Sequence, residues 1–118
     1  MKRILFLVRS APYGSATIAE SVRGCLGFTT MPFELHYVLM DDAAWVLIPN
    51  QQPSAIGAAP VLGLLSNLAE ADVRLYVDAV ALQQRGLSVD GVEPAFVPLD
   101  TDGLAELIAS ADAVLTYE

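Results

Sequence analysis

Cysteine, histidine and tryptophan each occur only once in this chain of 118 residues, as Cys25, His36 and Trp45. A single cysteine excludes an internal disulfide and a cysteine-based metal cluster. A single histidine likewise excludes a histidine-rich zinc site. The sequence therefore predicts neither a metal centre nor a resident cofactor.

Positive charge is also scarce: six lysines and arginines stand against fourteen acidic residues, for a formal net charge of −8. Proteins bind a phosphate backbone with clustered Lys and Arg, so this balance argues against direct nucleic-acid binding by the chain alone. No apolar run approaches the roughly 18 residues of a membrane span. Residues 1–8 begin with basic residues, as a signal peptide does. However, Arg9 interrupts the apolar run and no small-residue cleavage site follows. We therefore expect a cytoplasmic protein without a membrane segment.

Apolar residues, in contrast, are abundant and make up 54% of the chain, above the roughly 45–50% of ordinary soluble domains. We expect one domain, residues 1–118, which is too small to hide all of this surface in a core. Monomers rarely expose large apolar patches, so the composition predicts a subunit interface. The predicted interface comprises Trp45, Val46 and Ile48 together with the apolar residues of 55–65.

Short β-branched or apolar runs alternate with helix-forming segments along the chain. Strands are predicted at 4–8, 34–40, 73–77, 95–97 and 113–117, and helices at 17–26, 43–48, 61–69, 79–85 and 101–108. A loop over 51–59 and Pro60 are expected to precede the helix at 61–69. The alternation indicates a parallel α/β sheet with right-handed crossovers. We expect the strand order 2-1-3-4-5, with 4–8 and 73–77 as the most buried strands.

Asp78 stands where the predicted strand 73–77 turns into the predicted helix 79–85. A carboxylate there can accept hydrogen bonds from the first free N–H groups of the helix. In an open parallel sheet, ligands bind outside the carboxyl ends of the strands. Asp78 is therefore predicted to be a structural helix cap or the central polar group of a site.

Asp41 and Asp42 follow the predicted strand 34–40, so they could share one rim of the sheet with Asp78. Paired carboxylates can perform acid–base chemistry or bind a hard cation, although three helix caps explain these residues equally well. Trp45 lies just beyond them, and a lone Trp at such a rim is either a core residue or an interface anchor.

A turn follows the first strand and contains Pro12, Tyr13, Gly14, Ser15 and Thr17. Its backbone N–H groups could hold a small anion at a helix start, and an ordinary strand-to-helix turn explains it as well. The turn lacks the P-loop and the three-glycine dinucleotide pattern. The segment 17–20 fits a capping box, with Ser15 as an alternative cap.

Cys25 falls on the apolar face of the first helix with Ile18, Val22 and Leu26. A reactive thiol needs a lowered pKa and partial exposure, so we predict a buried, unreactive Cys25. His36 stands between apolar residues of a strand with no second histidine or cysteine for metal binding, and we predict that it lies on the strand surface.

Six segments together carry a likeness to a known family. They are 10–14, 39–45, 47–53, 75–78, 82–87 and 110–115. In their order and spacing they resemble the DsrE/DsrF-like proteins, most closely the DsrF/TusC branch. The resemblance implies a three-layer α/β/α sandwich and a subunit of a sulfur-relay complex. It implies DsrE/TusD-like and DsrH/TusB-like partners and a role in tRNA thiolation or sulfur oxidation.

The resemblance also assigns a meaning to Asp78, because DsrE/TusD subunits carry persulfide sulfur on a cysteine at the matching position. A carboxylate cannot carry sulfane sulfur, which implies a non-carrying subunit that is not catalytic by itself. Two alternatives remain open. One is a stand-alone homo-oligomer that binds a small anion or ligand at the turn or the strand rim, and the other is an enzyme using Cys25 or the acidic rim.

Overall fold

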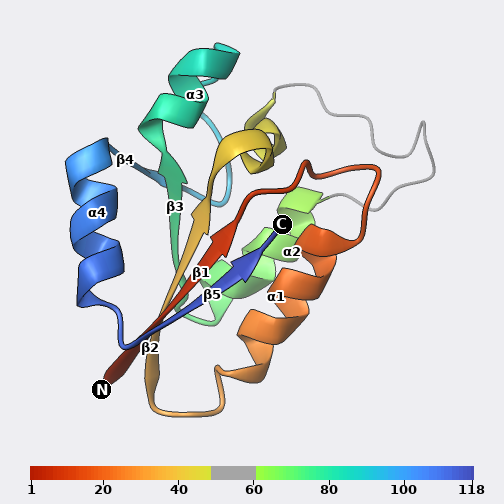
Figure 1. Ribbon diagram of the computed structural model, residues 1–118. Helices are drawn as coiled ribbons and strands as arrows, with labels where there is room; N and C mark the ends of the chain where they lie inside the picture. The colour runs from red at the N-terminus through yellow and green to blue at the C-terminus, as the bar shows by residue number, and fades with distance from the viewer. Residues whose placement is uncertain (49–60) are drawn as a thin grey trace.

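The computed structural model describes residues 1–48 and 61–118, which form a parallel sheet between helices (Figure 1). The elements are β1 (Lys2–Val8), α1 (Thr17–Gly27), β2 (Phe33–Leu39), the 3₁₀ helix η1 (Asp41–Leu47), α2 (Val61–Glu70), β3 (Arg74–Asp78), α3 (Ala79–Arg85), β4 (Val97–Leu99), α4 (Thr101–Ser110) and β5 (Ala113–Tyr117). The loop predicted over 51–59 and the role predicted for Pro60 lie outside the described residues.

The predicted fold class, an α/β sandwich around a five-stranded parallel sheet, is confirmed. The strand order is β4-β3-β2-β1-β5 and differs from the expected 2-1-3-4-5. The chain moves in one direction from β1 to β4 and only then crosses back to place β5 beside β1. Both orders leave β1 in the interior of the sheet, so its apolar run does not reveal where the chain reverses.

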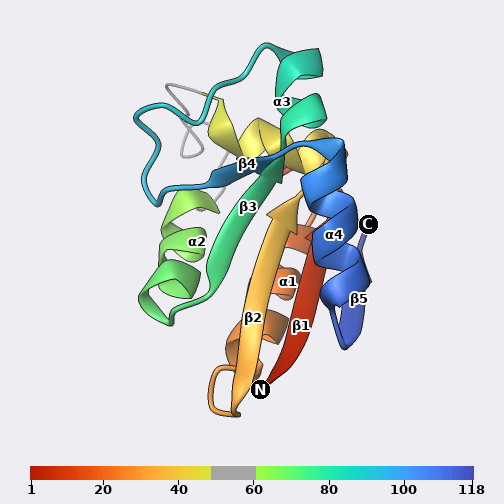
Figure 2. The ribbon, with the colours of Figure 1, turned by 90° about the vertical axis from the view of Figure 1, so that its left-hand side faces the viewer.

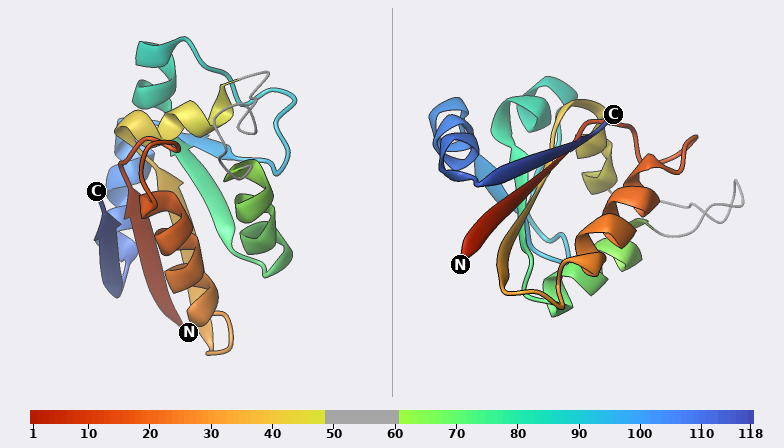
Figure 3. Two further views of the ribbon diagram at one scale, coloured as in Figure 1. Left: turned by 90° about the vertical axis from the view of Figure 1, so that its right-hand side faces the viewer. Right: turned by 60° about the horizontal axis from the view of Figure 1, so that its bottom comes forward.

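The helices form three groups around the sheet. α1 and α2 cover one face, α4 lies on the other face, and η1 and α3 gather at the carboxyl ends of the strands (Figures 1 and 3). This division follows from the crossovers: right-handed connections that advance in one direction place their helices on one face, and the returning connection places its helix on the other. No helix in the described ranges is long and apolar enough to cross a membrane.

The two faces are unequally covered. The main core lies under α1 and α2 and includes Phe6, Tyr37 and Leu65, all fully buried. On the opposite face a smaller cluster joins Leu104 of α4 to Leu5, Leu7 and Val38 of β1 and β2. Figure 2 shows α4 over that side of the sheet, with β3 beside the helix rather than beneath it.

This unequal cover explains the burial of the strands. Residues 4–8 of β1 are all buried, as predicted, and residues 35–39 of β2 are buried as well. In β3 only alternate residues are fully buried, whereas Arg74 is exposed and Tyr76 is half-buried. The prediction that 73–77 is one of the two most buried strands is therefore wrong. β3 is an interior strand, but its side chains on the α4 face lack a covering helix.

Candidate functional site

The rim predicted at the carboxyl ends of the strands exists, and Asp78 occupies it as a helix cap. β2 and β3 are neighbours, so the residues that follow them lie on the same edge of the sheet. The Asp78 carboxylate accepts a hydrogen bond from the backbone N–H of Val80 at 3.2 Å. α3 then ends at Gly86, whose positive φ of 65° suits glycine. The structural interpretation of Asp78 is thereby confirmed.

The caps predicted for Asp41 and Asp42 are wrong, because η1 begins without a side-chain cap. Asp41 accepts a hydrogen bond from Nε of Arg9 at 2.7 Å. Asp42 accepts one from Nη2 of Arg85 at 2.9 Å, which ties η1 to α3. The two carboxylates therefore pair with different arginines on different neighbouring elements.

These pairings leave little at the rim for acid–base chemistry or cation binding. Each of the three carboxylates is engaged by a guanidinium or by a backbone N–H group. Within residues 1–48 and 61–118, no three side chains of His, Cys, Asp or Glu are grouped so that they could hold a metal ion. The rim is built as a structural junction that fixes η1 and α3 at the end of the sheet.

Trp45 lies half-buried in η1 at the same end of the molecule. Its neighbour Val46 is fully buried, so the prediction that Val46 contributes to an interface is wrong. Val46 belongs to the main core because η1 packs its apolar side against the sheet. Ile48 is 41% exposed, so Trp45 and Ile48 keep an accessible surface. Of the predicted interface residues 55–65, those at 55–60 lie outside the described part of the chain.

The turn after β1 borders a hollow of about 140 Å³. Its lining residues are Pro12, Tyr13, Gly14, Ser15, Ala19, Val61 and Leu64. No lysine or arginine is among these described lining residues, so an anion there would depend on backbone N–H groups alone. Thr17 is the first residue of α1, and the helix has no side-chain cap, so the predicted capping box and the alternative cap at Ser15 are both wrong.

Cys25 is fully buried among core residues, as its helical spacing predicts. Burial raises the pKa of its thiol to about 12, because the apolar surroundings disfavour the thiolate. The thiolate is the nucleophilic form of cysteine. The only thiol of the chain is therefore held in its unreactive form.

His36 contradicts the prediction of a strand-surface residue, because only 1% of it is exposed. Its Nε2 lies 2.8 Å from Oε2 of Glu34, and its Nδ1 lies 2.9 Å from the hydroxyl of Tyr76. The Tyr76 ring stacks on the imidazole with the ring centroids 5.5 Å apart. Tyr76 thus covers His36 on the α4 side of the sheet, at a place that α4 itself does not cover.

Glu34 connects this pair to Arg3, whose Nε also binds the Glu34 carboxylate. The hydrogen bonds from His36 and Arg3 lower the pKa of Glu34 to about 2. An ionised carboxylate only accepts hydrogen bonds, so the proton of the neutral imidazole lies on Nε2. Nδ1 is then the acceptor, and the Tyr76 hydroxyl donates to it. Burial lowers the pKa of His36, which favours this neutral form.

The sequence contains a signal for this cluster, but it depends on knowing the register of the strands. Glu34 and His36 are two residues apart, as are Arg74 and Tyr76, so each pair lies on one face of its strand. In the sheet, Arg3 pairs with Glu34 and Arg74 pairs with His36. All five side chains therefore meet on the α4 face once the strand order is known.

Known proteins resemble this chain in sequence and in structure along almost its whole length. Residues 2–117 match the DsrE/DsrF-like family. The chain is 31% identical to Protein TusC of Escherichia coli K12 over 121 aligned residues, covering 99% of this chain and 100% of that protein. The values for Protein TusC of Shigella sonnei are the same. In structure it resembles the crystal structure of the ychN protein from E. coli, with a TM-score of 0.84, 25% identity and coverage of 98% of this chain and 99% of that one.

Proposed function

The chain belongs to the DsrE/DsrF-like family, and we propose that it is a non-carrying subunit of a sulfur-relay complex. In this role it assembles with DsrE/TusD-like and DsrH/TusB-like chains and organises the complex without carrying sulfur itself. The similarity to TusC proteins over 99% of the chain supports this branch of the family. It also favours tRNA thiolation over sulfur oxidation as the process that the complex serves.

One observation carries the proposal: the chain has no thiolate where a carrier would need one. By its resemblance to the family, we match the carrier cysteine to Asp78, whose carboxylate caps α3. The single cysteine, Cys25, is fully buried with a pKa raised to about 12. Persulfide transfer requires an accessible thiolate, so sulfur must be carried by a partner chain.

Co-expression tests the proposal directly. The chain is produced together with the DsrE-like and DsrH-like chains that the proposal expects in the same genome, and the purified material is weighed by native mass spectrometry. The proposal predicts a stable assembly that contains all three chains. A chain that purifies alone in the presence of both partners would contradict it.

The alternative of a stand-alone anion-binding protein has less support. The hollow beside Tyr13 and Gly14 has no cationic residue in its described lining. A homo-oligomer that forms in preference to the mixed assembly would favour this alternative.

A further inference from the structure

The two edges of the sheet are protected very differently. β4 forms one edge and β5 the other. An edge strand exposes backbone N–H and C=O groups that can pair with another chain, and natural edges are protected by charge, proline, bulges or shortness. β4 has this protection, because it is three residues long and its middle residue, Pro98, has no N–H group.

β5 lacks these protections. It has five residues, Ala113–Tyr117, and none of them is charged or a proline. Its register with β1 runs without interruption from Ile4 opposite Ala113 to Val8 opposite Tyr117, so no bulge bends it. No other described strand pairs with its outer side, and Figure 3 shows β5 at the margin of the sheet, beyond β1. The β5 edge is therefore open to another strand.

We propose that β5 is the contact through which two copies of this chain pair edge to edge, with antiparallel strands around a two-fold axis. The inference goes beyond the proposed function, because it concerns a contact of this chain with itself. The occupant must bring an unprotected edge of its own, and β5 of a second copy is such an edge. Pairing of β5 with β4 of another copy would build an open filament, and Pro98 opposes it.

The backbone fixes the register of this pairing. The carbonyl of Tyr117 accepts a hydrogen bond from the N–H of Arg9 at 2.9 Å, so Tyr117 turns its backbone groups towards β1. Backbone groups of successive strand residues point to opposite sides, so those of Val114 and Thr116 point outward, where no described residue binds them. Val114 of one copy and Thr116 of the other can then exchange both of their hydrogen bonds on each side of the axis. Leu115 lies opposite its own copy.

Apolar side chains beside the edge would be covered by the second copy. Val114 is 40% exposed, and it lies on the α4 face because Leu5, its neighbour on β1, does. Ile108 of α4 is 37% exposed. The flank of α4 towards β3 carries Glu106 and Ser110, so helical spacing places Ile108 on the opposite flank, towards β5. A two-fold axis perpendicular to the sheet brings the Ile108 residues of both copies to the line of contact.

Charge favours self-pairing at this edge over other surfaces. Two chains of net charge −8 repel each other, so contact costs least between uncharged segments such as β5. At each end of the paired strands, Asp112 of one copy would lie across from Glu118 of the other. Nη1 of Arg9 lies 3.0 Å from the Glu118 carboxylate, which places a cation beside these two acidic groups.

β5 is already fixed in the position that pairing requires. The Tyr117 ring stacks on Phe6, with the ring centroids 6.3 Å apart. A Cβ at Gly24 of α1 would lie 2.6 Å from the Tyr117 hydroxyl, so this glycine permits the close approach of helix and strand. At the other end of β5, the backbone N–H of Arg3 donates to the Asp112 carboxylate at 2.7 Å. A strand that is already ordered loses less entropy on association.

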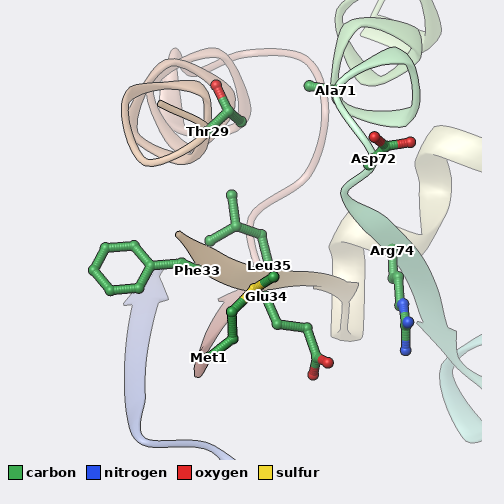
Figure 4. A pocket seen from close by; sticks show the side chains of 8 residues that line it. All are labelled: Met1, Thr29, Phe33, Glu34, Leu35, Ala71, Asp72 and Arg74. Carbon is green, nitrogen blue, oxygen red and sulfur yellow. The ribbon is translucent and has the colours of Figure 1, made fainter. Parts of the chain in front are cut away.

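The contact leaves other surfaces of the chain accessible to partner subunits. The rim around Asp78 lies at the carboxyl ends of β2 and β3. A hollow of about 360 Å³ lies at their amino ends, and none of its described lining residues belongs to β5 (Figure 4). Self-pairing and the proposed function can therefore succeed or fail independently.

Analytical ultracentrifugation of the full chain tests the inference, which predicts a concentration-dependent dimer. Val114→Lys places a charge at the β5 edge. Val97→Lys makes the same change on β4, the other edge strand, where Val97 is 54% exposed. We expect Val114→Lys to raise the dissociation constant of the dimer about tenfold or more, since the axis doubles the effect, and Val97→Lys to leave it unchanged. Both side chains are exposed, so circular dichroism should report the native fold for both variants.

A second pair of variants tests the backbone itself. Thr116→Pro removes an outward N–H group that has no described partner within the chain, whereas Thr116→Ala keeps it. Only the proline variant should weaken the dimer. Hydrogen exchange of the native chain gives a readout that needs no variant. The amides of Val114 and Thr116 should become protected as the protein concentration rises through the range in which the dimer forms.

Three outcomes overturn the inference. A native chain that stays monomeric up to about 100 μM has no such contact. If Val114→Lys dimerises as tightly as the native chain, the dimer contact lies elsewhere. If Val97→Lys weakens the dimer as much as Val114→Lys does, the loss does not belong to the β5 edge. None of these results changes what the co-expression experiment says about the proposed function.

Discussion

The hydroxyl of Tyr76 donates a hydrogen bond to Nδ1 of His36 across 2.9 Å, and the two rings lie nearly parallel, at 14° to each other. On its other side, the imidazole is bound to the ionised carboxylate of Glu34. The charged or titratable groups facing His36 are thus Glu34, Tyr76, Arg3 and Arg74. This arrangement makes the neutral imidazole part of the folded structure.

Stability should therefore fall as the pH drops below about 6.5. Burial, assisted by Arg3 and Arg74, lowers the pKa of His36 from its ordinary value of 6.5. Between the ordinary and the lowered pKa, the unfolded chain binds a proton that the folded chain does not, so acid favours unfolding. Urea unfolding at about pH 7.5 and about pH 5 measures this loss, a range in which histidine titrates. In His36→Gln the loss should be smaller, and an equal loss in both proteins would show that another group is responsible.

Cys25 should accept no sulfur while the protein is folded. Its thiol is fully buried and its pKa is raised to about 12, so almost no thiolate is present near neutral pH. The native chain is incubated with a persulfide donor and weighed by mass spectrometry, with urea-unfolded protein as the control that the thiol is competent. A native protein that gains the mass of one sulfur atom per chain would revive Cys25 as a carrier.

Removing the Asp78 carboxylate should destabilise the fold by about 1 kcal/mol, the usual loss for a helix N-cap. The carboxylate accepts the hydrogen bond of the Val80 N–H group, which Asp78→Ala leaves without this partner. Asp78→Ser supplies another capping oxygen and should restore most of the loss. Chemical denaturation of the three proteins gives the comparison, and equal losses in Ala and Ser would mean that the cap has no measurable effect.

Two glycine substitutions should have opposite effects. Gly86 ends α3 with φ of 65°, a conformation that costs other residues about 1–2 kcal/mol, so Gly86→Ala should destabilise. Gly63 lies exposed in α2, and a Cβ there would meet no described atom within 4 Å. Gly63→Ala should stabilise by about 0.5–1 kcal/mol, because alanine is the better helix former. Thermal unfolding of the two variants measures both effects, and a stabilised Gly86→Ala or a destabilised Gly63→Ala would contradict the prediction.

The sequence predicts most of the local elements, although the fourth strand, predicted at 95–97, lies at Val97–Leu99. The junction at Asp78 is readable because strand propensity, a capping carboxylate and helix propensity follow each other directly. Cys25 is readable because its spacing from Ile18 and Val22 places it on an apolar helix face. Both features depend on residues close in the chain, and the structure contains both.

Features that depend on strands meeting are not readable in this way. The burial of His36 results from Tyr76 stacking over it from the neighbouring strand. The predicted caps at Asp41 and Asp42 did not form because Arg9 and Arg85 bind these carboxylates from distant parts of the chain. The return of the chain after β4, which places β5 beside β1, is likewise not predictable from the local sequence, because the apolar run of β1 suits either strand order.

We propose that this chain organises a sulfur relay without carrying sulfur itself. Mass spectrometry of each chain in the co-purified complex, after incubation with a persulfide donor, tests it most directly. The proposal predicts that a partner chain gains the mass of sulfur while this chain keeps its unmodified mass, because Cys25 is buried and Asp78 stands at the position that the proposal matches to the carrier cysteine. Sulfur found on this chain within the intact complex would contradict the proposal.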